Sequence, residues 1–148
     1  MIQHLHTRNY IIFTTLFLFY GCAYFNTFYN AKQYYEEAEK LRLEKDGESI
    51  PITAMDKYAK TIKKCQTVIN DFPKSKYVIE ARLLMSKARY YRSDLDIAIS
   101  DLGEIQRMGT NDQKEEAKYW KALCKWKKGS VSAALNELDN LLKNSKSR

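Results

Sequence analysis

Side chains that commonly carry catalysis or bind metals are scarce in this chain of 148 residues. The two histidines, His4 and His6, both precede an apolar N-terminal stretch, and no Cys-x-x-Cys pair or Gly-rich phosphate loop occurs. Carboxylate pairs such as Glu36-Glu37 and Glu115-Glu116 fall on polar faces of predicted helices, where we expect them to be solvated. Ser-His-Asp catalysis, Cys-His catalysis and histidine-based metal sites are therefore excluded from the region after that stretch. We predict a protein without enzymatic activity, cofactor, metal or small-molecule substrate.

The apolar stretch itself predicts export. Residues 10–20 are almost wholly apolar and follow a weakly basic start that contains Arg8. About 11 apolar residues suit the central region of a signal peptide, whereas a membrane-spanning helix needs about 20. The sequence thus predicts a lipoprotein signal peptide over residues 1–21.

Cys22 directly follows this segment and is the one cysteine with a predicted chemical role. The residues 18–22, LFYGC, resemble a bacterial lipobox, in which a small residue precedes the cysteine that becomes the acylated N-terminus. Two or more acyl chains anchor a protein stably to a membrane, so we predict an acylated Cys22 and a tether over residues 22–30. An uncleaved anchor ending in an ordinary cysteine is the alternative. The aromatic, uncharged residues 23–30 either lie at the lipid interface or pack on the first helical repeat.

The rest of the chain is organised around residues 77–107, which we predict to form two helices with a hinge at residues 92–94. Asp94 is placed to cap the second helix with its carboxylate. Apolar residues recur there at three- and four-residue steps, which is the helical period. These residues are Ala81, Leu84, Met85 and Ala88 in the first helix, and Ala98, Ile99, Leu102 and Ile105 in the second.

The same design occurs three times. Residues 117–142 repeat it at an offset of 36 residues. In that copy Ala134, Leu138, Leu141 and Ala122 take the places of Ala98, Leu102, Ile105 and Ser86. A third copy lies upstream, with predicted helices at 31–45 and 54–70 joined by a loop over 46–53; there Thr61, Cys65 and Val68 take the places of Ala98, Leu102 and Ile105. We expect Cys65 and Cys124, at apolar helix positions, to pack as small hydrophobic residues.

At these residues the chain resembles the tetratricopeptide (TPR) repeat family, whose period is about 34 residues. The small residues Ser86 and Ala122, the hinge residues Ser93 and Gly129, and the closing Pro73 match that pattern. The segment VINDFPKSKYVIEARLLMSKARYY (residues 68–91) is similar to outer-membrane TPR lipoproteins of the BamD (YfiO) type. The resemblance implies an all-α superhelix of about three helical hairpins over residues 31–148.

The resemblance also implies a partner-binding groove lined by the first helix of each hairpin. Its predicted lining residues are Leu83, Lys87, Tyr90 and Tyr91 from the central repeat and Tyr119, Leu123, Trp126 and Lys127 from the last, with Glu80 and Glu116 beside them. Aromatic anchors with a basic rim are typical of protein interfaces. The alternative is that Tyr90 and Trp126 pack between helices.

The formal net charge of +7 favours anionic partners. Five lysines (Lys118, Lys121, Lys125, Lys127 and Lys128) are interleaved with Tyr119, Trp120 and Trp126, as in some nucleic-acid-binding patches. The run wraps around a helix, however, and an exported chain does not meet cytoplasmic nucleic acid. We therefore expect a protein partner or anionic lipid, and no nucleic acid.

By the resemblance, we expect a non-enzymatic scaffold anchored to the periplasmic face of the bacterial outer membrane. Its partner would be a periplasmic or outer-membrane protein, in the class of the machinery that assembles outer-membrane proteins. The first alternative is an envelope-maintenance factor that contacts peptidoglycan or a division complex. The second is an inner-membrane-anchored assembly helper with an uncleaved N-terminus.

Overall fold

The computed structural model of the protein describes residues 25–44 and 49–146. The predicted signal peptide over residues 1–21 and the predicted lipidation site Cys22 lie outside these ranges. Within them, every regular element is an α-helix, so the predicted all-α fold of helical hairpins is confirmed.

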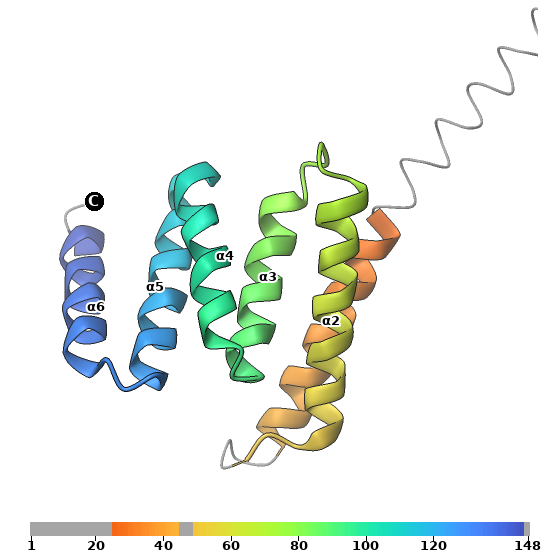
Figure 1. The fold of residues 1–148 in the computed structure, drawn as a ribbon, viewed down its shortest axis with the longest axis horizontal. Helices are drawn as coiled ribbons and strands as arrows, with labels where there is room; N and C mark the ends of the chain where they lie inside the picture. The colour runs from red at the N-terminus through yellow and green to blue at the C-terminus, as the bar shows by residue number, and fades with distance from the viewer. Residues whose placement is uncertain (1–24, 45–48, 147–148) are drawn as a thin grey trace, which may run out of the picture.

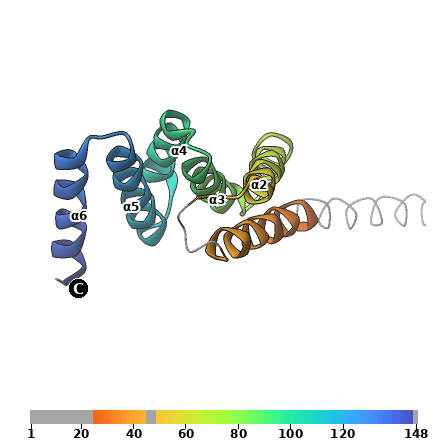
Figure 2. The ribbon, with the colours of Figure 1, turned by 90° about the horizontal axis from the view of Figure 1, so that it is seen from below.

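Residues 25–43 are helical, and five more helices follow along the chain. They are α2 (Ile52–Asp71), α3 (Val78–Tyr91), α4 (Leu95–Met108), α5 (Asn111–Lys127) and α6 (Val131–Lys146). Neighbouring helices run antiparallel, so that residues 25–43 with α2, α3 with α4, and α5 with α6 form three successive hairpins (Figure 1). In Figure 2, α2 and α4 lie along one side of the array, with residues 25–43 and α5 along the other. The odd-numbered helices α3 and α5 also contact each other directly.

The two later hairpins turn at the same kind of hinge. Ser93 and Gly129 both have positive φ angles, of 66° and 89°. The Ser93 N–H donates to the carbonyl oxygen of Tyr90 (3.1 Å), and the Gly129 N–H donates to that of Trp126 (2.8 Å). The N–H of the residue after each hinge donates to the carbonyl oxygen one residue earlier in the helix. This second hydrogen bond completes the Schellman motif that ends many helices. The predicted hinges at residues 92–94 and at Gly129 are confirmed.

The N-caps of the helices agree less closely with the sequence pattern than the hinges do. Thr110 and Gln113 form the reciprocal pair of a capping box at the start of α5. Asp94 occupies the N-cap position of α4, but its side chain makes no capping hydrogen bond, so the predicted cap is wrong. Its carboxylate lies instead 3.7 Å from Nε of Arg92. An ion pair with the preceding turn has replaced the hydrogen bond to the helix.

The core lies where the repeat register predicts it. Ala98 and Ala134 are buried, as are Thr61 and Val68 of the first hairpin. Cys65 and Cys124 are buried free thiols, in agreement with the prediction that they pack as hydrophobic residues. Small side chains at these positions allow two helices to approach closely, which is why the same pattern recurs at each hairpin.

The first hairpin begins earlier than the sequence predicts. Residues 25–30, assigned to the tether, are helical, and Phe28 is buried in a cluster with Ala31 and Met85. The ring of Phe28 stacks on that of Tyr77, with 5.2 Å between centroids. Of the two alternatives for this aromatic segment, packing on the repeats therefore holds for Phe28. The helical body includes at least part of the predicted tether.

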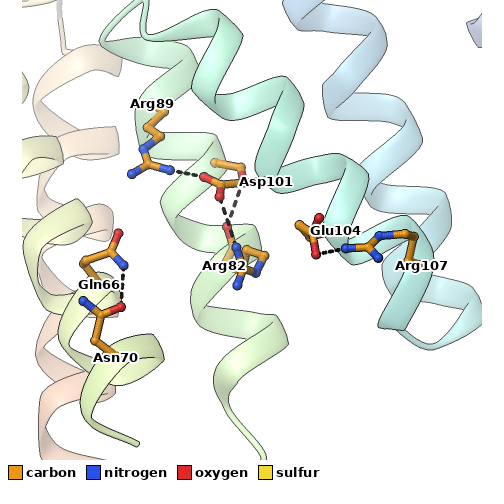
Figure 3. A network of polar contacts seen from close by, with 8 residues as sticks. Gln66, Asn70, Arg82, Arg89, Asp101, Glu104 and Arg107 are labelled. Atoms are coloured by element: carbon orange, nitrogen blue, oxygen red, sulfur yellow. Dashed lines mark hydrogen bonds and ion pairs between the residues drawn. The ribbon is translucent and has the colours of Figure 1, made fainter. Parts of the chain in front are cut away.

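A charged cluster joins the two helices of the central hairpin (Figure 3). Asp101 on α4 accepts from Nη1 of Arg82 at 3.2 Å and also from Nη1 of Arg89, both on α3. Asp101 is one of the few buried polar residues among those described. A buried carboxylate needs such partners, because burying an unpaired charge is costly. Glu104 and Arg107 pair with each other further along α4 (Figure 3).

Candidate partner-binding surface

Six aromatic rings form a continuous series of contacts across the hairpins, which we call the aromatic band. The first steps join Tyr35 to Tyr58 (5.8 Å between centroids) and Tyr58 to Tyr91 (5.0 Å, stacked). Tyr91 meets Tyr90 edge-on at 5.2 Å. The series continues from Tyr90 to Trp120 (5.4 Å) and from Trp120 to Tyr119 (5.9 Å). The band thus runs from the first hairpin to α5.

Three cations lie over the rings of this band. The guanidinium of Arg42 is 4.6 Å from the centroid of Tyr91, and Nζ of Lys127 is 4.8 Å from that of Tyr90. Nζ of Lys87 lies 5.6 Å from Trp120. A cation within about 6 Å of an aromatic face is attracted by the ring's quadrupole. The band therefore combines aromatic rings, of which Tyr58 is fully buried, with three cations, of which Arg42 and Lys87 are also paired with Glu39 and Glu116.

The first-hairpin end of the band is rigidly held. The Tyr58 hydroxyl donates to Glu39, which also accepts from Nη2 of Arg42 at 2.7 Å. Burial, and then the hydrogen bond to Glu39, raise the pKa of Tyr58. Burial likewise raises the pKa of Tyr35, Tyr90 and Tyr91. These phenols therefore stay neutral at physiological pH and add no negative charge to the band.

The central-repeat residues predicted to line a groove fall into two groups. Tyr90, Tyr91 and Lys87 lie half-buried at the band, and Lys87 also pairs with Glu116 on α5. Leu83 is different: it is only 7% exposed and packs with Ala98, Leu102 and Ala117. Its prediction as a partner-binding residue is corrected, because α5 covers this position in the central hairpin.

Lys127 ties α5 to the end of α3. Its Nζ donates to the carbonyl oxygen of Tyr90 at 3.0 Å, and burial lowers the pKa of its amine. Two further lysines of the predicted basic run also make contacts within the protein, Lys125 with Glu137 and Lys128 with Asp96. These contacts hold the lysines in place and neutralise two of the charges.

The exposed part of the candidate surface lies on α5. Tyr119 and Trp126 are 46% and 55% exposed, with the half-buried Leu123 between them on the same helical face. At an offset of 36 residues, the three occupy the positions of Leu83, Lys87 and Tyr90 on α3. In the central hairpin these positions face α5, whereas no described helix follows α6. Both alternatives posed for the predicted anchors therefore occur: Tyr90 packs between helices and Trp126 is exposed.

Four contributors to the band were not among the predicted binding residues. They are Tyr35, Arg42, Tyr58 and Trp120. Tyr35 and Trp120 were visible in the sequence as aromatic residues on amphipathic helices. Their mutual alignment depends on how three hairpins stack, which no local pattern encodes.

Two cavities lie away from the band. One, of about 270 Å³, is formed by α4, α5 and α6 and is lined by Gln106, Lys118, Lys121, Glu137, Asn140 and Leu141. The other, of about 290 Å³, is lined by Glu37, Lys40, Leu41, Glu44 and Lys57. Charged side chains make up half of the first lining and all but Leu41 of the second.

Within residues 25–44 and 49–146, no group of three or more His, Cys, Asp or Glu side chains is arranged to hold a metal ion. None of the helices in the described part of the chain is both long and apolar enough to cross a membrane. Comparison of the chain with protein-family models, curated proteins and solved structures finds no match.

Proposed function

We propose that the protein is a non-enzymatic scaffold of the TPR type, lipid-anchored through Cys22, which binds another protein at the periplasmic face of the bacterial outer membrane. A part in outer-membrane protein assembly, as the resemblance to BamD-type lipoproteins implies, belongs to this proposal. The observation that carries it is the exposed face of α5 formed by Tyr119, Leu123 and Trp126, at the α5 end of the aromatic band.

The chemistry of this face supports a protein ligand. Aromatic residues, Tyr and Trp among them, are enriched in protein–protein interfaces relative to the rest of a protein's surface. Tyr and Trp supply large apolar contact area at little loss of rotamer freedom. Nζ of Lys127 lies over the ring of Tyr90, and Lys127 follows Trp126 in the chain, so a partner segment with apolar anchors and a flanking carboxylate fits best.

The test uses the full chain, purified through an affinity tag from detergent-solubilised membranes. Replacing Tyr119 and Trp126 together by Ala should abolish recovery of the partner, because aromatic anchors typically contribute about 2 kcal/mol or more each. The recovered proteins are compared with those of the wild type by quantitative mass spectrometry. Both rings are about half exposed, so circular dichroism and Tm should stay near wild type.

A matched control comes from the other end of the array. Phe25 and Tyr29 are similarly exposed aromatic residues, and their rings lie 6.3 Å apart. Their double replacement by Ala should leave partner recovery intact. A folded Tyr119/Trp126 double variant that still recovers the partner contradicts the proposed binding face. Labelling with an alkyne fatty acid tests the anchor separately, since wild type should be tagged and Cys22→Ser should not.

A further inference from the structure

The cavity formed by α4, α5 and α6, which we call the α4–α6 cavity, lies on a different face of α5 from Tyr119 and Trp126. Its lining residues are Gln106, Lys118, Lys121, Glu137, Asn140 and Leu141. Its volume of about 270 Å³ is slightly below the roughly 300–1,000 Å³ of sites that hold drug-sized ligands. The cavity therefore suits a small ligand.

Two positive charges in this cavity have no counter-charge. The side chains of Lys118 and Lys121 make no ion pair or hydrogen bond within residues 25–44 and 49–146. The carboxylate of Glu137 is already paired with Nζ of Lys125 on α5. Because this pair is neutral, the cavity keeps an excess of two positive charges. Unpaired ammonium groups that line one cavity attract anions.

The central hairpin shows how the protein satisfies the same repeat positions elsewhere (Figure 3). At an offset of 36 residues, Lys118 takes the place of Arg82, and Lys121 takes that of Met85. Nη1 of Arg82 donates to Asp101 at 3.2 Å, and Met85 is buried in the core. Neither contact recurs for the two lysines within the described residues, so both ammonium groups are left for a ligand.

The amide side chains of the cavity differ from the central hairpin in the same way. Asn70, the counterpart of Gln106, accepts from Nε2 of Gln66 at 2.8 Å (Figure 3). The side chains of Gln106 and Asn140 make no hydrogen bond in the described part of the chain. Asn140 also takes the place of Glu104, so an amide stands where the central hairpin has a carboxylate. The last hairpin thus offers additional N–H donors and one negative charge fewer at this place.

We propose that the α4–α6 cavity binds a phosphate group with two negative charges, either as free phosphate or as a small phosphate monoester. A monoester carries about −1.5 to −2 charges at pH 7 and presents three acceptor oxygens. The two unpaired ammonium groups balance this charge, and the two amides add donors. A single carboxylate or a phosphodiester carries only one negative charge. Leu141 supplies apolar contact for the organic part of a monoester.

Thermal unfolding of the full chain in detergent, at constant pH and ionic strength, tests the site. Glycerol 3-phosphate and inorganic phosphate should each raise Tm with increasing concentration, because a ligand that binds the folded state stabilises it. Acetate and dimethyl phosphate carry one charge each and should raise Tm less. A larger rise with glycerol 3-phosphate assigns the site to a monoester, and an equal or smaller one assigns it to free phosphate.

Replacing Lys118 and Lys121 together by Gln removes both charges. The phosphate concentration needed for a given rise in Tm should then increase at least about tenfold, since these lysines supply the charge-assisted hydrogen bonds to the anion. Lys121→Met alone installs the residue of the central hairpin and should weaken the response in the same direction. Circular dichroism without phosphate checks that each variant is folded.

The matched control is the double variant of Lys63→Gln and Lys64→Gln on α2. One of these lysines is exposed and the other half-buried, as for Lys118 and Lys121, but neither lines the cavity. This variant should respond to phosphate as the wild type does. The proposal is overturned by an equal loss in both double variants, by an unchanged response without Lys118 and Lys121, or by an equally strong response to acetate. No rise in Tm for the wild type would overturn it too. The readout needs no partner protein, so it is independent of the proposed function.

Discussion

The central and the C-terminal hairpins carry corresponding residues at an offset of 36 positions, yet their surroundings differ. Leu102 on α4 is fully buried, whereas its counterpart Leu138 on α6 is half-buried. Leu83 on α3 lies in the core, and its counterpart Tyr119 on α5 is exposed. The central hairpin has α2 on one side and α5 on the other, while in the described part of the chain the last hairpin is contacted from one side only.

This difference in burial separates residues that stabilise the fold from residues that can contact a partner. Within a stack of hairpins, a residue on the face toward the next hairpin is buried only if that hairpin covers it, because each repeat contacts mainly its neighbours. The same repeat position can therefore serve as core in one copy and as a partner surface in the next. The substitutions at these positions should then have graded effects, larger in the central hairpin than in the last.

The largest difference is expected at the small residues between helices. Ala98→Glu should destabilise the protein by several kcal/mol, because it buries a carboxylate without a partner. Ala134→Glu should destabilise it less, since α6 contacts only α5 among the described helices α2 to α6 and the longer side chain can reach solvent. Thermal melts check both, with Glu104→Ala, which removes only a surface pair with Arg107, as the control. Equal Tm values for the two Glu variants would contradict the difference between the hairpins.

A second, smaller difference is expected at the charged cluster. Asp101 pairs with Arg82 and Arg89, and Glu137 pairs with Lys125 at the corresponding place on α6. Asp101→Asn should lower the free energy of unfolding by about 3 kcal/mol, because two largely buried arginines lose their counter-charge.

Glu137→Gln is the comparison in the last hairpin. This residue is more exposed than Asp101, so the loss should be about 1 kcal/mol or less. Urea denaturation measures both variants. If Glu137→Gln costs as much as Asp101→Asn, the two clusters are equivalent and exposure does not set the difference.

The sequence predicted most of this fold because each repeat is encoded locally. Apolar spacing identified the helices. The predicted hinges at Ser93 and Gly129 placed the ends of the preceding helices within a residue or two of where the structure has them. The placement of Leu83 in a groove was wrong, since its burial depends on the following hairpin and not on its own helix. The aromatic band joins residues from four helices, so only the stacking of hairpins reveals it.

The smallest effects are expected at the two hinges, where the same turn is made by different residues. Ser93 holds a left-handed conformation that costs a residue with a Cβ about 1 kcal/mol, whereas Gly129 adopts it freely. Gly129→Ala should therefore destabilise the protein by about 1 kcal/mol through backbone strain alone, since an added Cβ would meet no atom within 4 Å. Ser93→Gly should change stability by less than about 0.5 kcal/mol, because relief of strain is offset by the greater freedom of glycine in the unfolded chain. Urea denaturation of both variants measures this asymmetry; a neutral Gly129→Ala would show that the last hinge does not need its left-handed turn.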